Sequence, residues 1–220
     1  HYPKPRVLSV TQATECGTVY SVEEVHAAGE LARRLGLKLH MDGARLGNAV
    51  AHLGVAPADI TWRAGVDVLC WGMTKCGVAA GEAVVFFNRQ LSAEFDYRCK
   101  QAGQLASKMR FLAAPWAAML RSGAWLRHAA HANACAERLE RGLRAIPGAR
   151  MLFPRQANSV FVDIPGAAAD ALHAKGWHFY PFVGATGVRL MCAWDTAPGT
   201  VDAFAADVRE LSLAHAAEAP

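Results

Sequence analysis

Residues 37–45, LKLHMDGAR, and residues 66–75, VDVLCWGMTK, decide the fold of this chain. In each stretch a largely apolar run predicts a β-strand, and an ionisable side chain follows it: Asp42 in the first and Lys75 in the second. Parallel α/β sheets gather their ligand sites at the carboxyl ends of their strands. The two stretches therefore predict an α/β domain in which a carboxylate and an amine come to one crevice.

The residues around these stretches predict alternating strands and helices. An apolar run at 7–10 is followed by a helix that opens at Ser21 with capping-box spacing and stops at Gly36. A strand, a helix and a second strand in this order predict a right-handed parallel crossover. A second crossover leads to the strand at 66–72. The strand at 83–87 follows too closely for another crossover, so we expect it to be antiparallel.

The second half of the chain predicts a smaller, mixed domain. A polar stretch at 90–105 looks helical, and a longer helical region at 113–145 has a candidate break at Gly123. Three strands and two further helices are expected beyond it, with the strands at 150–153, 159–164 and 187–192 and the helices at 167–175 and 201–215. We predict domains at 1–112 and 113–220, with a boundary inside the long helix as the alternative.

Composition and charge limit the partners, the compartment and the metal sites that we expect for this protein. The formal charge of +4 is spread without runs of Lys or Arg, so it gives no reason to expect nucleic acid or a membrane surface as a partner and is compatible at most with a small anionic ligand. The six cysteines show neither paired nor zinc-finger spacing, so we expect free thiols in a reducing cytoplasm and no metal. No stretch approaches the roughly 18 apolar residues of a membrane span.

An Asp and a Lys in one crevice are what pyridoxal phosphate chemistry requires. The lysine amine forms a Schiff base with the cofactor, and the carboxylate keeps a proton on the pyridine nitrogen. We expect residues 69–72 to be buried, which would favour the neutral, nucleophilic amine of Lys75. Each residue also has a plain structural explanation, because Asp before Gly is a common turn former and a loop lysine is usually solvated.

Four other polar residues accompany this pair. The Thr74 hydroxyl either bonds the cofactor phosphate or satisfies the backbone. Arg45, one helical turn after Asp42, either lies on a solvated helix start or binds an anion. Arg189 is a lone charge in an apolar strand, which is costly unless paired, so we favour binding of a substrate carboxylate. His40 shares a strand face with Asp42 and either orients it or packs in the core.

At these residues the sequence resembles the threonine aldolase family of fold-type I pyridoxal phosphate enzymes, in particular its low-specificity L-threonine and phenylserine branch. Five segments carry the resemblance: HMDGAR at 40–45, GMTK at 72–75, AGEA at 80–83, SKMRFL at 107–112 and GVR at 187–189. It implies the C-terminal part of a large cofactor-binding domain with a mostly parallel sheet, followed by a small α+β domain.

The resemblance also implies roles for single residues. Lys75 would form the Schiff base, Asp42 would hold the pyridine nitrogen, and Arg45 and Arg189 would contact the cofactor hydroxyl region and the substrate carboxylate. The implied reaction is retro-aldol cleavage of a β-hydroxy-α-amino acid to glycine and an aldehyde. The implied assembly is a homo-oligomer, a dimer or a tetramer.

Members of the family carry a phosphate-binding Gly/Ser/Thr loop and a ring-stacking aromatic before the point where this chain begins. We therefore expect the 220 residues to be the C-terminal portion of a longer enzyme and to bind the cofactor poorly alone. Three alternatives stay open: a β-eliminating lyase, an aminotransferase, and a non-catalytic truncated remnant.

Overall fold

The structure, a computed structural model, describes residues 1–164, 166–184 and 186–218. Its contacts divide the chain into two compact units: unit 1 holds residues 1–14 and 19–128, and unit 2 holds residues 15–18 and 129–220. The division falls inside a long helix, which is the alternative that the sequence left open beside a boundary at 112/113. The assignment of 1–112 and 113–220 to two domains stays a prediction.

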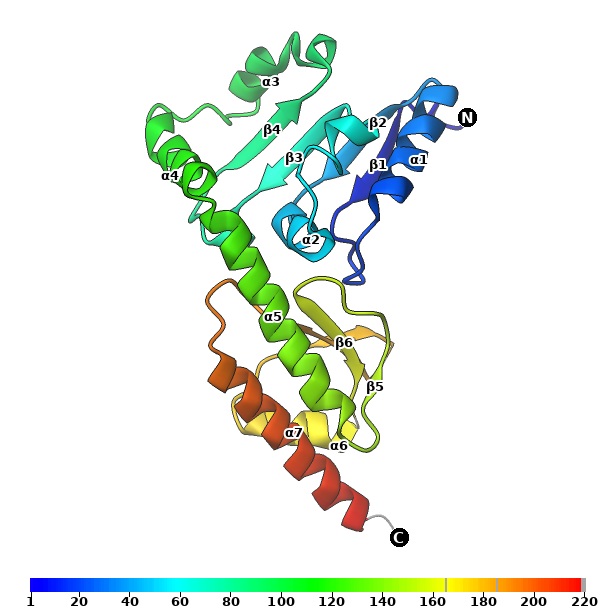
Figure 1. Cartoon of the computed structure of the whole chain (residues 1–220), viewed down its shortest axis with the longest axis vertical. Coiled ribbons are helices and arrows are strands. Elements are labelled where there is room, and N and C mark those ends of the chain that lie inside the picture. The colour runs from blue at the N-terminus through cyan, green and yellow to red at the C-terminus, as the bar shows by residue number, and fades with distance from the viewer. Residues whose placement is uncertain (165, 185, 219–220) are drawn as a thin grey trace. The chain divides into compact units, whose positions relative to one another are not determined.

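Unit 1 is built on a four-stranded sheet, sheet A, whose strands follow the order of the chain (Figure 1). They are β1 (Val7–Thr11), β2 (Lys38–Asp42), β3 (Val68–Gly72) and β4 (Glu82–Phe86). The first three are parallel, and β4 pairs with β3 in the antiparallel sense. All four predicted strands and the reversal at the last one are confirmed.

The helical segments of unit 1 lie between its strands and after β4, and the short helical turn at residues 74–76 was not predicted. They are α1 (Val22–Arg34), α2 (Leu46–Leu53), η1 (Trp62–Ala64), η2 (Thr74–Cys76), η3 (Arg89–Ser92), α3 (Phe95–Gln101) and α4 (Met109–Ser122). The predicted capping box opens α1, because the backbone N–H of Glu24 donates to the Ser21 hydroxyl and the Glu24 carboxylate accepts from the Ser21 backbone N–H. Gly123 ends α4 with φ 66°, so the predicted break is confirmed.

The two faces of sheet A differ in exposure. Leu39, Met41 and Leu69 are fully buried on one face. The other face carries His40, Asp42 and Cys70, and Cys70 is exposed. The expectation that residues 69–72 are buried is therefore wrong for Cys70. Successive side chains of a strand point to opposite faces, and here only one of the two faces is well covered.

Unit 2 contains a second four-stranded sheet, sheet B, which is antiparallel throughout and has the order β5-β6-β8-β7. Its elements are α5 (Ala124–Arg144, whose first residues belong to unit 1), β5 (Arg150–Met151), β6 (Ser159–Asp163), α6 (Gly166–Ala174), β7 (Pro181–Val183), β8 (Gly187–Met191) and α7 (Pro198–Glu218). The three predicted strands are confirmed, although the first is shorter than expected. β7 is an addition that the sequence reasoning missed.

The core of unit 2 lies between sheet B and its helices. Side chains of β6 and β8 pack with side chains of α5, α6 and α7, including Leu143, Val160, Leu172, Val188 and Phe204. This arrangement places every second residue of β8 in the core and the residues between them, Arg189 among them, on the opposite face.

Across the residues that the structure describes, no helix combines the length and the apolar character needed to cross a membrane.

Candidate active site

Asp42 ends β2 on a tight turn. Its Oδ1 accepts a hydrogen bond from the backbone N–H of Ala44 at 2.9 Å, and the N–H of Gly43 donates to the carbonyl of Cys70 at 2.7 Å. A Cβ on Gly43 would lie 2.6 Å from Cδ1 of Leu69 and 3.1 Å from the carbonyl oxygen of Cys70. Only glycine lets β2 approach β3 this closely, so the Asp-Gly pair fixes the carboxylate at the carboxyl edge of sheet A.

Lys75 lies in η2, which is one turn of 3-10 helix. Met73 and Cys76 on either side of it are buried, whereas Thr74 and Lys75 are exposed. The N–H of Cys76 donates to the carbonyl of Met73 at 2.8 Å and closes the turn. The segment before Lys75 does not bury its amine, because only the neighbours Met73 and Cys76 are packed into the protein. Desolvation of the amine would have to come from a ligand or from another polypeptide.

Side chains of α4 and α5 support the turn that carries Lys75. A ring nitrogen of His128, Nδ1, lies 2.7 Å from the carbonyl oxygen of Cys76. The Trp71 ring, at the end of β3, packs edge-on against Trp116 at 5.6 Å and Trp125 at 5.2 Å between ring centroids. These contacts make the three tryptophans packing anchors. They also tie the start of η2 to two helices.

The ends of β2 and β3 bring Asp42, Thr74 and Lys75 to one edge of sheet A. The two strands are parallel neighbours, and Asp42 pairs in register with Cys70, which lies two residues before the end of β3. η2 follows β3 directly. A carboxylate and an amine are thus available at the edge where α/β sheets bind ligands.

Two carboxylates flank the thiol of Cys70 on this face. Desolvation raises the pKa of Cys70, and the negative charges of Asp42 and Glu82 raise it further. Glu82 begins β4 opposite Gly72, where a Cβ would lie 2.5 Å from a Glu82 carboxylate oxygen. Glu82 lies within the AGEA segment at 80–83, but a single polar residue after a turn carries no local signal from which a role could be predicted.

Arg45 and His40 lie on either side of Asp42 along the chain. Arg45 immediately precedes α2, is half-buried and has a buried Nε, so it is not a solvated surface residue. His40 Nδ1 lies 2.8 Å from the hydroxyl of Ser9 on β1. The hydrogen bond at the His40 ring is therefore to the neighbouring strand.

Arg189 belongs to unit 2, where it is the third residue of β8 and pairs with Phe161. Its side chain is only 16% exposed. Nη2 donates to the hydroxyl of Tyr180 at 2.5 Å, and Nη1 lies 3.5 Å from a carboxylate oxygen of Glu15. The charge is paired, as its cost in an apolar strand requires. The five other predicted site residues belong to unit 1, and Arg189 belongs to unit 2.

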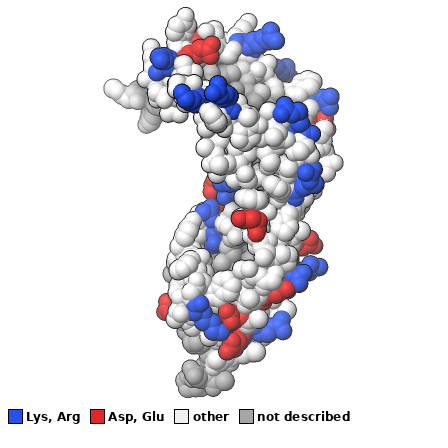
Figure 2. Space-filling view, turned by 90° about the vertical axis from the view of Figure 1, so that its left-hand side faces the viewer, with Lys and Arg blue, Asp and Glu red and all other residues white. Residues whose placement is uncertain are grey.

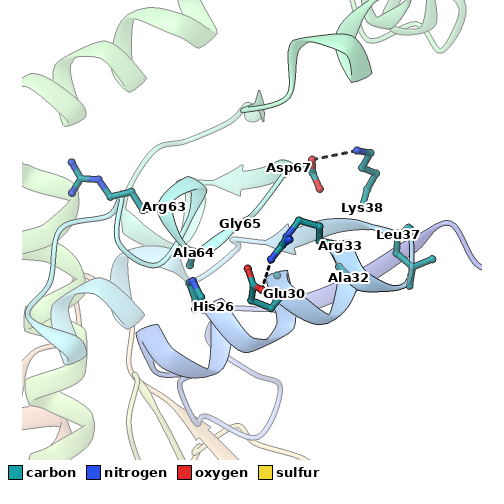
Figure 3. Close-up of a pocket in the computed structure, with 12 residues that line it drawn as sticks. His26, Glu30, Ala32, Arg33, Leu37, Lys38, Arg63, Ala64, Gly65 and Asp67 are labelled. Carbon is teal, nitrogen blue, oxygen red and sulfur yellow. Dashed lines mark hydrogen bonds and ion pairs between the residues drawn. The ribbon is translucent and has the colours of Figure 1, made fainter.

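A cavity of about 330 Å³ opens at the other end of sheet A, where β2 and β3 begin (Figure 3). Each of its Lys and Arg side chains forms an ion pair nearby, and Arg63 does so with Asp59, which is not among the lining residues. Lys38 lies 3.9 Å from Asp67, and Glu30 pairs with Arg33 one turn along α1. Because these charges compensate locally and lie at the amino ends of the strands, we do not place the reaction there.

Charged side chains are dispersed over the face shown in Figure 2. Lys and Arg side chains lie there in small groups separated by uncharged residues, with Asp and Glu side chains among them. Within the described residues, no group of three or more His, Cys, Asp or Glu side chains is arranged to hold a metal ion.

Residues 1–166 match a protein family described as beta-eliminating lyase. The chain is similar to two curated relatives, each called low specificity L-threonine aldolase. It is 58% identical over 214 residues to that of Pseudomonas sp. strain NCIMB 10558, covering 97% of this chain and 62% of the relative. It is 57% identical over 209 residues to that of Pseudomonas aeruginosa, covering 95% of this chain and 60% of the relative.

A solved structure of a threonine aldolase from Leishmania major has a similar fold. Its TM-score is 0.87 at 27% sequence identity, over 94% of this chain and 61% of that one. This likeness confirms the predicted fold class, an α/β fold of fold type I. The chain spans about three fifths of the length of the relatives and of the solved structure that it matches.

Proposed function

Because the chain belongs to the beta-eliminating lyase family, we propose that it cleaves a β-hydroxy-α-amino acid of the threonine or phenylserine type to glycine and an aldehyde, by itself or as part of a longer protein. The names of its two Pseudomonas relatives support this reaction. The observation that carries the proposal is the pair Asp42 and Lys75, which follow neighbouring parallel strands at one edge of sheet A.

The residues at this edge fit pyridoxal 5′-phosphate as the cofactor. One oxygen of Asp42 accepts from Ala44, which leaves the second oxygen to accept the N–H of a pyridinium ring. The exposed amine of Lys75 is free to hold an aldehyde, and the exposed Thr74 beside it offers a hydroxyl to a phosphate. When bound, the cofactor supplies an electron sink for the carbon–carbon cleavage.

The remaining residues bind and orient the substrate in this proposal. Arg45 and Arg189 hold the cofactor hydroxyl region and the substrate carboxylate, for which a guanidinium is suited because it offers two parallel N–H donors. Holding the carboxylate fixes which bond at Cα stands perpendicular to the ring, so binding selects the bond that breaks. His40, which is hydrogen-bonded to Ser9, lies beside Asp42 on the same face of β2 and lines the cofactor site there.

Two other functions predict different products. A β-eliminating lyase or an aminotransferase would use the same cofactor pair but release a keto acid. A non-catalytic remnant would keep the fold and form no Schiff base. The family match alone favours none of these over the aldolase, whereas the two close relatives favour the aldolase.

The test is to incubate the protein with pyridoxal 5′-phosphate and L-threonine or phenylserine, and to measure absorbance and products. We expect Schiff-base absorbance together with glycine and aldehyde in equal amounts. Lys75→Ala should abolish both signals, because Lys75 is the only lysine in the connection between β3 and β4, residues 73–81. Lys38→Ala, which removes a lysine from the opposite end of sheet A, should retain both.

Keto acid in place of aldehyde would assign the protein to one of the other two reactions. Absence of Schiff-base absorbance at saturating cofactor, in a folded protein, would favour the remnant. Absorbance that persists in Lys75→Ala would contradict the assignment of the lysine.

We further propose a cytoplasmic location and a homo-oligomeric assembly. All six cysteines are free thiols, which supports a reducing compartment. The assembly rests on the family resemblance, and sedimentation of the protein measures it directly.

A further inference from the structure

The guanidinium of Arg189 is enclosed by aromatic side chains. It lies 4.4 Å from the ring centroid of Phe182 and 5.8 Å from that of Tyr180, and it donates to the Tyr180 hydroxyl at 2.5 Å. Phe182 rests in turn on the buried ring of Phe161, at 5.4 Å between centroids. A cation over an aromatic face is attracted by the ring quadrupole, and this attraction grows when water is excluded.

The backbone explains why Tyr180 reaches Arg189. Pro181 pairs with Val188 between β7 and β8, and continuing this antiparallel register sets Tyr180 opposite Arg189. Proline restricts the residue before it to an extended conformation, so Tyr180 keeps the direction of the strand although β7 begins after it. The Tyr180 side chain is 55% exposed, so the core does not require its hydroxyl.

The other end of the guanidinium faces a weaker partner. Glu15 is 65% exposed, and its carboxylate oxygen lies 3.5 Å from Nη1, at the limit of a hydrogen bond. Nε of Arg189 is buried and has no hydrogen-bond partner among the described residues. At Nη1, an incoming carboxylate can therefore replace the loosely held carboxylate of Glu15.

We propose that Tyr180, supported by Phe182, is a positioning residue that fixes the guanidinium of Arg189 for a carboxylate ligand, and that Glu15 is the counter-ion which this carboxylate replaces. The inference rests on the proposed function, in which Arg189 binds the carboxylate of an amino acid. It adds that Tyr180 and Glu15 act on affinity in opposite directions. Tyr180 holds the cation in the binding geometry, and Glu15 competes for it.

Kinetics with a matched pair of substrates test this proposal. The substrates are a β-hydroxy-α-amino acid and its carboxamide, which has no negative charge for Arg189. In Tyr180→Phe we expect KM for the acid to rise about tenfold, the size of one lost hydrogen bond to a charged group. KM for the carboxamide and kcat for the acid should stay within about twofold of the values for the unsubstituted protein. The substitution removes one hydroxyl, and this hydroxyl contacts none of the reacting atoms.

Two further variants complete the comparison. Glu15→Gln should lower KM for the acid and leave the carboxamide unchanged. Tyr97→Phe, which alters an exposed tyrosine of α3 in unit 1, is the matched control and should change neither value. Equal effects of Tyr180→Phe on both substrates, or no effect on either, would overturn the proposal.

A measurement without substrate separates this inference from the proposed function. The exchange of the Arg189 guanidinium protons, followed by NMR, should become faster in Tyr180→Phe and stay unchanged in Tyr97→Phe. If the unsubstituted protein cleaves neither substrate, the proposed function fails, and the NMR result alone decides the positioning role. Unchanged exchange in Tyr180→Phe would then refute it.

Discussion

Sheet A and sheet B hold their candidate residues by different means. In sheet A the backbone holds the candidate residues in place. Asp42 is fixed by the N–H of Ala44 and by the close approach of Gly43 to β3, and Lys75 is fixed by a turn whose flanking residues are buried. In sheet B side chains hold the candidate residue in place, because Tyr180 and Glu15 contact the charged group of Arg189 in the middle of a strand.

The difference follows from where each charge lies on its strand. A residue at the carboxyl end of a parallel strand is already at the edge that binds ligands, so a turn is enough to present it. A charge inside an antiparallel strand must be compensated by partners from neighbouring elements. Substitutions that alter the backbone should therefore disturb unit 1 most, and substitutions of aromatic side chains should disturb the arginine of unit 2.

Asp42→Asn should give the largest effect, because it removes the charge and keeps the turn. Asn retains an oxygen that accepts from the Ala44 N–H, so the fold of unit 1 should be preserved. We expect kcat to fall on the order of 100-fold, as for other losses of one preorganised charge-stabilising group. Steady-state kinetics at saturating cofactor measure this. Activity near that of the unsubstituted protein would remove Asp42 from the site.

Gly43→Ala should give a smaller effect, on stability rather than chemistry. The new Cβ would approach Cδ1 of Leu69 and the carbonyl of Cys70, so β2 and β3 must separate slightly. We expect a loss of about 1–3 kcal/mol in the free energy of unfolding, the usual cost of overpacking.

Urea unfolding measures this change, with Gly199→Ala as the control. Nothing lies within 4 Å of a Cβ at Gly199, near the start of α7, so that variant should be neutral or slightly more stable. Equal stability of the Gly43 and Gly199 variants would show that backbone proximity does not hold the Asp42 turn.

The elements that a local sequence pattern marks could be predicted from the sequence. The strands of sheet A, the antiparallel sense of β4, the capping box at Ser21 and the break at Gly123 follow from hydrophobic runs, connection lengths and glycine. β7 was missed because it is short, begins at Pro181 and shows no alternation. Asp42 and Lys75 lie at the carboxyl ends of neighbouring strands, as predicted, because the apolar run before each of them marks its strand.

Burial and side-chain partners could not be predicted in the same way. The exposure of Cys70 and Lys75 depends on what covers a face of sheet A, and no local pattern contains that information. Glu15 and Tyr180 are single polar residues outside regular strands, which only the folded structure brings to Arg189. Such contacts depend on tertiary register.

The central claim is that Lys75 and Asp42 serve one bound cofactor. Borohydride reduction of the protein with pyridoxal 5′-phosphate, followed by peptide mass mapping, tests it most directly. We expect a pyridoxyl label on Lys75, with lower occupancy in Asp42→Asn at limiting cofactor. A label on another lysine with Lys75 unmodified, or equal occupancy with and without the Asp42 charge, would contradict it.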